Sequence, residues 1–406
     1  MAERDFDLIL WGATGFTGRL VAEYLVDRYG VDGDLRWAIA GRNQAKLEAV
    51  RSELLPQSSR QHLALFVGDS HDRSSLDALA RRATVICTTV GPYAKYGTPL
   101  VEACVDAGTH YCDLTGEVQW MQRIIASLHD KAQANGAKIV HTCGFDSIPS
   151  DLGTFFVQQA MIEKFGTPGG LVKCRVGDND GTFSGGTVAS MLNVMDEAKR
   201  DPAVRQSMND PYSLYPVGTA AGVDGPDQTS ARFDASFDQW TCPFVMAAIN
   251  GRVVRRSNAL MAFPWGEDFA YSEAQLCSSR GAAVRTTLAM GAGMGALAFG
   301  PTRKLLERFL PDPGEGPDRE SRERGFYEMF LQAENSAGVL RAKVTGDMDP
   351  GYGSTSKMLG EAAVCLAKDD LGEGGGILTP ASAMGDHLID RLTANAGLTF
   401  ELVDTH

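Results

Sequence analysis

The sequence lacks the cysteine spacing of a zinc or redox motif. No two of its eight cysteines are separated by two residues, and the thiols are spread widely along the chain. Reduced, buried thiols suit this distribution better than disulfides or a zinc site, so we expect no metal centre. The cysteines are Cys87, Cys104, Cys112, Cys143, Cys174, Cys242, Cys277 and Cys365.

The sequence also lacks an excess of positive charge. Its 406 residues contain 38 Lys and Arg against 51 Asp and Glu, a formal net charge of -13. Such a protein repels a phosphate backbone, which argues against a nucleic-acid partner. Met1–Asp5 contains no basic segment followed by an apolar one, so we expect a cytoplasmic protein.

An uncharged stretch, Thr286–Gly300, is too short to cross a bilayer as a helix. Gly291 and Gly295 share one helical face and allow another helix to approach, while Met290 and Met294 form the neighbouring stripe. We expect this segment to be buried in a homodimer or beside a hydrophobic substrate channel. Peripheral contact with a membrane surface is the alternative.

A strand, a glycine turn and a helix follow one another near the N-terminus. The apolar run Phe6–Trp11 ends at Gly12, and a helical pattern runs from Arg19 to Tyr29. Gly12 permits the tight turn, Gly15 lets the backbone approach a pyrophosphate, and Gly18 lets the helix pack on the strand. This order predicts a dinucleotide site rather than an ordinary strand–helix turn. The cofactor contacts predicted here are Gly12, Thr14, Gly15, Phe16, Thr17 and Gly18.

The second predicted strand, Leu35–Ala40, is followed by Gly41 and Arg42 instead of an acidic residue. An acidic side chain at this position would bind the ribose 2′-hydroxyl of NAD, whereas a guanidinium suits the 2′-phosphate of NADP. Lys46 lies one turn later. We therefore predict that Gly41, Arg42 and Lys46 contact NADP(H); a solvated arginine at a helix start is the alternative.

Strands and helices alternate to about residue 150, which predicts a doubly wound, Rossmann-type parallel sheet. Asp69 follows the third strand, where it borders the adenine or caps the next turn. Gly91 and Pro92 follow the fourth strand, where such a sheet places the nicotinamide end of the cofactor. Tyr93 faces the reaction space or packs as an aromatic, and Thr115 ends the fifth strand. These later strands are predicted at Leu63–Val67, Val85–Val90, Thr109–Glu117 and Lys138–Thr142.

The alternation then stops, and the chain divides into three predicted parts. Residues 1–150 form the NADP-binding domain, 151–350 an α+β substrate or dimerisation domain, and 351–406 a segment that returns to the first domain. Within the middle part we expect a long loop over 200–239 and short strands with turns over 240–280. Further turns or loops are predicted at Thr182–Gly186 and Pro311–Arg324.

Six segments together resemble the saccharopine dehydrogenase-like oxidoreductases, and most of all the bacterial branch with the trans-acting enoyl reductases of mycobacterial lipid synthesis. They are Trp11–Gly18, Ala40–Arg42, Val90–Tyr93, His110–Glu117, Cys143–Gly153 and Leu378–Gly385. The resemblance implies an NADP(H)-binding Rossmann domain and an oxidoreductase of lipid metabolism. It is weaker over 200–330, and it supplies no settled catalytic residue.

The expected reaction follows from this resemblance and from the polar strand ends. No tyrosine precedes a lysine by four residues, so the mechanism of short-chain dehydrogenases is excluded. We expect an NADPH-dependent reductase of an apolar acyl substrate, such as an enoyl thioester on a carrier protein. Tyr93, Thr115 and the backbone near Gly144 are the predicted donors to the developing enolate. A saccharopine-reductase-like imine or amino-acid oxidoreductase and a non-catalytic NADP-sensing protein are the alternatives.

Overall fold

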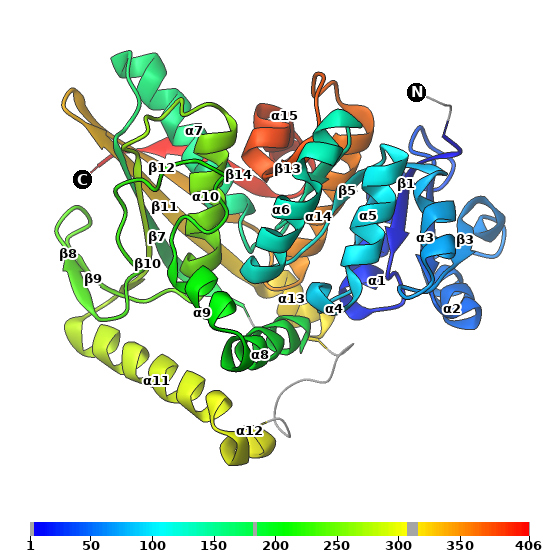
Figure 1. Ribbon diagram of the computed structural model, residues 1–406, viewed down its shortest axis with the longest axis horizontal. Helices are drawn as coiled ribbons and strands as arrows, with labels where there is room; N and C mark the ends of the chain where they lie inside the picture. Colours follow the sequence, from blue (N-terminus) through cyan, green and yellow to red (C-terminus); the bar gives the residue numbers. More distant parts are fainter. Residues whose placement is uncertain (1–3, 182–184, 307–315, 406) are drawn as a thin grey trace.

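Two seven-stranded sheets form the framework of the molecule (Figure 1). The structure is a computed structural model that describes residues 4–181, 185–306 and 316–405. The predicted turn at Thr182–Gly186 and the predicted loop at Pro311–Arg324 lie partly outside these residues. In their described parts, helix α8 begins at Gly185 and helix α13 at Arg319.

The first sheet is parallel throughout, in the order β13-β6-β5-β4-β1-β2-β3. The central strand β1 forms because its apolar residues Leu8–Trp11 are buried between two layers of helices. Leu8 pairs with Trp37 on one side and with Val85 on the other. The strands are β1 (Phe6–Trp11), β2 (Trp37–Gly41), β3 (Ala64–Val67), β4 (Ala83–Thr88), β5 (His110–Cys112), β6 (Lys138–Val140) and β13 (Gly376–Leu378).

Helices cover both faces of this sheet, and the apolar residues of β1 alternate between the two sides. Ile9 belongs to the core beneath the first group of helices, and Leu8 to the core beneath the second. The first group is α3 (Arg73–Ala80), α5 (Thr98–Ala107) and α6 (Val118–Ala134); the second is α1 (Phe16–Tyr29), α2 (Gln44–Leu54) and α14 (Gly353–Lys368). The expected Rossmann-type α/β fold is confirmed.

The second sheet is mixed, in the order β14-β12-β11-β7-β10-β9-β8. Residues alternate between buried and half-buried along β12, as expected for a sheet with one face on a core. Helices α7 (Ile148–Phe165) and α15 (Pro380–Asn395) pack beside it, and α10 (Ala247–Leu260) contacts β10. The strands are β7 (Leu171–Asp180), β8 (Arg232–Asp234), β9 (Gln239–Cys242), β10 (Ala270–Cys277), β11 (Phe326–Asn335), β12 (Gly338–Gly346) and β14 (Leu398–Val403).

The two sheets share one hydrophobic core. Leu8 and Leu10 of the first sheet belong to the same buried cluster as Val172 and Val344 of the second. The tail contributes to both sheets: α14 and β13 join the first, whereas β14 pairs with β12 of the second. The last strand therefore departs from the expectation that the whole tail returns to the first domain.

The middle of the chain differs from the prediction in three places. Residues 240–280 contain the long helix α10 between their strands, and part of the loop predicted over 200–239 is helix α9. Strand β11 was not predicted at all. The remaining helices are the 3₁₀ helix η1 (Arg60–His62), α4 (Tyr93–Tyr96), α8 (Gly185–Arg200), α9 (Pro202–Asn209), α11 (Arg280–Ala298), α12 (Gly300–Leu306) and α13 (Arg319–Arg324).

Helix α10 was missed because it buries charged side chains rather than a simple apolar stripe. Arg256 donates hydrogen bonds to the carbonyl oxygens of Leu214 (2.5 Å) and Ile377 (2.6 Å), which lie far away in the sequence. Burial lowers the pKa of Arg256 to about 10. Arg252 and Arg255 of the same helix are buried as well, which hides the helical periodicity of hydrophobic residues.

Helix α11 lies at the edge of the molecule, and Ala283 is its one buried residue (Figure 1). Leu288 is 67% exposed and Met294 42% exposed, and the space around Gly291 and Gly295 is open. Among the described residues, no helix is long and apolar enough to cross a membrane.

Candidate functional site

The glycine turn joins β1 to α1 in a geometry that only glycine permits. Gly12 has a φ of 96°, and its N–H donates to the carbonyl oxygen of Ala40 (2.9 Å). A Cβ atom at Gly18 would lie 2.2 Å from the carbonyl oxygen of Gly12. No side chain caps α1 at Gly15, so the N–H groups of its first turn are available to phosphate oxygens. This turn fits the pyrophosphate of a dinucleotide.

Arg42 lies at the end of β2, on the same edge of the sheet as the glycine turn. Asn43 caps α2 by accepting a hydrogen bond from the Lys46 N–H (3.0 Å). The side chains of Arg42 and Lys46 are exposed, and neither makes a hydrogen bond or ion pair with another described residue. Both cations therefore remain available to a ribose phosphate.

Asp69 occupies the turn after β3. Its Oδ1 accepts a hydrogen bond from the His71 N–H (2.8 Å), and its own N–H donates to Ser75 Oγ (3.1 Å). These contacts give Asp69 the turn-capping role that was the alternative in the sequence. Its contact with adenine stays a prediction.

A buried carboxylate fixes the segment after β4, which contains Gly91 and Pro92. Glu117 accepts hydrogen bonds from the N–H groups of Tyr93 (2.7 Å) and Ala94 (3.1 Å). It also accepts one from Ser190 Oγ (3.0 Å), which brings α8 to this edge. Burial raises the pKa of Glu117, although these hydrogen bonds oppose the shift. No role was predicted for Glu117 beyond its place in the motif His110–Glu117.

Tyr93 and Thr115 are both buried at the ends of the strands. The Tyr93 hydroxyl accepts a hydrogen bond from the Leu114 N–H (3.2 Å) and donates to the Thr88 carbonyl oxygen (3.3 Å). Burial raises its pKa well above the ordinary value. Thr115 Oγ1 accepts a hydrogen bond from the Glu117 N–H (3.1 Å), which leaves the hydroxyl hydrogen to donate. Catalytic roles for Tyr93 and Thr115 stay predictions.

Asp113 ties the ends of β5 and β6 together, a role that was not predicted. Its carboxylate accepts hydrogen bonds from the Tyr111 hydroxyl and His141 Nδ1 (both 2.8 Å), and from the N–H groups of Thr115 (3.0 Å) and Thr142 (3.3 Å). Thr142 has a φ of 60°, a left-handed conformation that β-branched residues rarely adopt. Such strain persists only where the surroundings hold it, here at the carboxyl edge of the parallel sheet.

The segment after β6 is held from both sheets. The Phe145 N–H donates to Thr355 Oγ1 of α14 (3.0 Å), and Ser147 Oγ donates to Asn250 Oδ1 of α10 (3.0 Å). Asp146 lies between these two anchored residues and is half-buried. Burial, reinforced by the nearby charge of Asp113, raises the pKa of Asp146 to about 7.

Comparison with known proteins identifies the family. Residues 8–140 match the family model described as the saccharopine dehydrogenase NADP binding domain. The trans-acting enoyl reductase of Mycobacterium ulcerans (strain Agy99) is 40% identical, over 96% of this chain and 96% of that protein. A Mycobacterium tuberculosis (strain ATCC 25618 / H37Rv) protein, provisionally given the same name, is 43% identical over 98% of this chain and 97% of its own length. The chain belongs to the trans-acting enoyl reductase family.

Members of this family share a fold with saccharopine dehydrogenase. The apo structure of the L-Glu forming enzyme from Saccharomyces cerevisiae covers 98% of this chain and 99% of its own, with a TM-score of 0.53. At 14% identity this likeness shows the fold alone. The predicted family, the use of NADP(H) and the assignment as an NADP-dependent oxidoreductase are confirmed.

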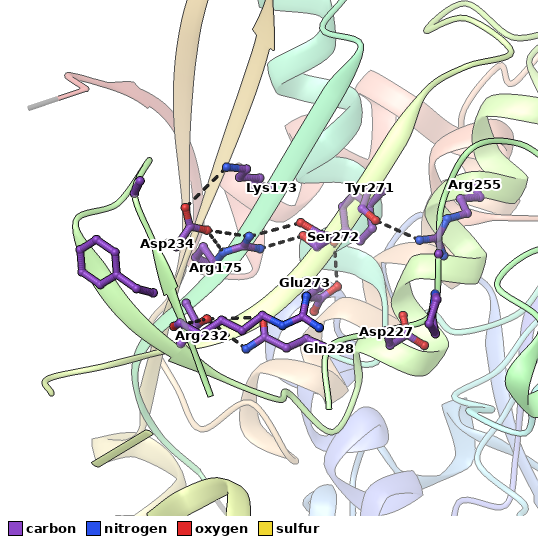
Figure 2. Close-up of a pocket in the computed structure, with 15 residues that line it drawn as sticks. Lys173, Arg175, Asp227, Gln228, Arg232, Asp234, Arg255, Tyr271, Ser272 and Glu273 are labelled. Carbon is purple, nitrogen blue, oxygen red and sulfur yellow. Dashed lines mark hydrogen bonds and ion pairs between the residues drawn. The ribbon is translucent and has the colours of Figure 1, made fainter. Parts of the chain in front are cut away.

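A second feature of this family member is a polar cavity of about 280 Å³ in the second sheet (Figure 2). Arg175 pairs with Asp234 (2.7 Å) at its wall, and Figure 2 shows Arg232 reaching across toward Glu273. Because charged groups form so much of this wall, the cavity does not suit an apolar acyl chain. Its charged lining residues are Lys173, Arg175, Asp227, Arg232, Asp234, Arg255 and Glu273.

Proposed function

We propose that the protein uses NADPH to reduce the carbon–carbon double bond of an α,β-unsaturated thioester with an apolar chain, presented on a carrier protein. One observation carries this proposal: relatives named trans-acting enoyl reductase align with 96% to 98% of the chain. The alignment therefore includes the region over 200–330, where the sequence motifs were weakest and where a substrate would be selected.

The first sheet supplies the proposed cofactor contacts. The glycine turn and α1 hold the pyrophosphate, and Arg42 with Lys46 holds the 2′-phosphate. When bound, NADPH supplies a hydride. Gly91 and Pro92 border the nicotinamide end, where Tyr93 and Thr115 remain the proposed donors to the developing enolate. The full set of proposed contacts is Gly12, Thr14, Gly15, Phe16, Thr17, Gly18, Gly41, Arg42, Lys46, Asp69, Gly91 and Pro92.

The proposal includes a homodimer formed through α11. Exposed apolar side chains on a helix without charge over 286–300 favour a protein contact over water. Open space beside Gly291 and Gly295 would admit the backbone of a second helix. The alternative is that an acyl chain or a membrane surface contacts Met290 and Met294. A test must distinguish these two possibilities from a dimer contact. The cytoplasmic location and a role in lipid metabolism stay part of the proposal.

The test is the oxidation of NADPH by the purified protein, followed by its loss of absorbance. We expect turnover with trans-2-enoyl thioesters of pantetheine or of a carrier protein, and more with long chains than with short ones. An amino acid mixed with a keto acid, which forms an imine, should give no turnover. Turnover with the imine mixture alone would contradict enoyl reduction and favour the saccharopine-reductase-like alternative.

A further inference from the structure

Asp146 lies where the loops after two neighbouring strands of the first sheet meet α10. It follows β6, and a Cβ atom built at Gly116, in the loop after β5, would lie 3.9 Å from Asp146 Oδ1. The same atom would lie 2.9 Å from Ile249 Cδ1 of α10. The Asp146 carboxyl therefore lies at the carboxyl edge of the parallel sheet, where a doubly wound fold binds its ligands.

The hydrogen bonding of Asp146 differs from that of Asp113 and of Asp151. Asp113 accepts four hydrogen bonds, and Asp151 accepts hydrogen bonds from the Ser257 hydroxyl and the Ala381 N–H. Within the described residues, Asp146 has no such partner apart from its own backbone N–H. A half-buried carboxyl that stabilises no other part of the protein at a sheet edge points to a function rather than to a structural role.

The surroundings of Asp146 favour its protonated form. Burial raises its pKa to about 7, and the negative charge of Asp113 acts in the same direction. The neighbours of Asp146 in the chain and in the adjacent loop contact uncharged residues: Gly116 lies close to Ile249 of α10, and the Phe145 N–H donates to Thr355 of α14. A carboxyl in this state gives up a proton readily at neutral pH.

We infer that Asp146 is the acid that protonates the substrate carbon next to the thioester carbonyl, an inference that rests on the enoyl reduction proposed above. Bound NADPH would supply the hydride for the new C–H bond at the β-carbon by losing a nicotinamide C–H bond, and the π electron pair would move to the α-carbon and thioester oxygen. The Asp146 O–H bond breaks as its proton forms the C–H bond at the α-carbon. The enoyl group is reduced, NADPH is oxidised to NADP⁺, and the Asp146 carboxylate takes up a proton from water.

The anchored neighbours of Asp146 explain how the acid is held in place. Phe145 is fixed to α14 and Ser147 to α10, so the residue between them has little freedom to move. Asn250 also donates to Glu273 Oε1 (2.8 Å), which connects this anchor to β10. A general acid needs such fixed geometry relative to the carbon that it protonates.

The first test measures turnover of an enoyl thioester against pH. In the wild type the rate should fall about tenfold per pH unit once Asp146 is deprotonated above its pKa. Asp146→Asn should lower the rate about 100-fold or more and abolish this pH dependence. Asp146→Ala should recover part of its rate when acetic acid is added, which a purely structural residue would not show. NADPH affinity should stay within about twofold of the wild type, since none of the proposed cofactor contacts is altered.

Asp151→Asn is the matched control. Asp151 is also buried, with a pKa raised to about 7 by burial, but it is fully hydrogen-bonded within the protein. An asparagine can accept from the Ala381 N–H and donate to the Ser257 hydroxyl, so this variant should fold. It should keep the turnover rate and the pH dependence of the wild type. Loss of the pH dependence in Asp151→Asn and not in Asp146→Asn would overturn the inference.

The protonation state can be read without any cofactor. The infrared difference spectrum between wild type and Asp146→Asn, recorded on the apo proteins, should contain a protonated carboxyl band that disappears as the pH rises through about 7. Absence of this band would overturn the inference even in an active enzyme. Full turnover by Asp146→Asn would overturn only the assignment of Asp146 as the acid and would leave the proposed function standing. A wild-type protein that reduces no enoyl thioester would refute both the assignment and the proposed function.

Discussion

Apart from the edge strand β3, the strands of the first sheet are mostly buried, whereas those of the second sheet mix buried residues with half-buried and exposed ones. In β1, the residues after Asp7 are apolar up to the turn at Gly12, where the cofactor site is predicted to begin. In the second sheet, polar side chains such as Arg175 and Ser272 lie along the strands and line a cavity. The first sheet thus builds its site from strand ends, and the second from strand faces.

The largest expected effect on folding comes from expressing the first region without the rest of the chain. We expect residues 1–150 alone to be poorly soluble and unable to fold, because Leu8 and Val85 would lose α14 and expose their shared core. Size-exclusion chromatography and a thermal melt would check this. A monomeric fragment that melts sharply and binds NADPH would show that the first sheet is independent of the tail.

Gly18→Ala should be the most damaging single substitution considered. The new methyl would meet backbone atoms of Gly12, which cannot rotate away, so we expect a loss of about 3 kcal/mol in the free energy of unfolding together with weaker NADPH binding. Gly170→Ala, beside the second sheet, is the control because no atom lies within 4 Å of its added methyl. Urea denaturation should show a change below about 0.5 kcal/mol for Gly170→Ala; equal losses in both variants would contradict the close approach at Gly18.

Arg42→Ala tests the prediction that Arg42, at the end of β2, binds the 2′-phosphate of NADPH. NADPH binding should weaken by about 1.5–3 kcal/mol, the range for a hydrogen bond to a charged group. NADH lacks the 2′-phosphate, so its affinity should hardly change. Calorimetric titration with the two nucleotides measures the difference, and an equal loss of both would show that Arg42 does not contact the phosphate.

The pH dependence of stability sharpens the comparison, because the second region buries two carboxyls with a raised pKa, Asp151 on α7 and Glu273 on β10. Burial raises the pKa of Asp151 to about 7, and that of Glu273 in the second sheet to about 7. Since the folded state binds a proton that the unfolded state has released, each group should lower stability by roughly 1 kcal/mol per unit as pH rises from about 4 to 7. Above that range its contribution should stay constant.

Asp151→Asn and Glu273→Gln should each remove one such contribution. Urea denaturation of the wild type and both variants across this pH range checks the sign. A difference between wild type and variant that grows more favourable to the wild type as pH rises would show that the carboxyl is ionised in the folded protein.

The smallest effect on stability is expected for Met290→Glu combined with Met294→Glu. Met294 is exposed and the space beside α11 is open, so the monomer should change by less than about 0.5 kcal/mol. The variant should instead become monomeric in light scattering, or lose turnover of long-chain but not short-chain substrates. No change in mass, stability or chain-length preference would leave α11 as ordinary surface.

The sequence predicted the first sheet well because its signals are local. Phe6–Trp11 was predicted as a strand and is β1, and each later strand of this sheet up to β6 overlaps its prediction. Buried parallel strands read as short apolar runs, and a glycine follows β1 and closes β2. Only β13 was not foreseen, since its three residues, Gly376–Leu378, carry no such pattern.

The structure of the second region and of the carboxyl edge of the first sheet depends on contacts between residues far apart in the sequence. Arg256 donates hydrogen bonds to the backbone of Leu214 and Ile377, and no local sequence pattern indicates those contacts. Asp146 lies in a motif that was recognised, yet its place beside the loop that contains Gly116 depends on how the segments after β5 and β6 meet. Such long-range contacts decide which polar residue is structural and which is free to react.

The place of α14 and β13 in the first sheet has a consequence during protein synthesis. The nucleotide-binding layer begins at residue 6, but its last strand ends at Leu378. At the usual pace of translation, roughly 5–20 residues per second, residues 1–150 would wait tens of seconds for that strand to leave the ribosome. Throughout this interval the apolar face later covered by α14 is open to chaperones and to other nascent chains. Translation that stops before Leu378 therefore yields a protein whose nucleotide-binding sheet lacks its last strand, even when most of the second sheet has been made.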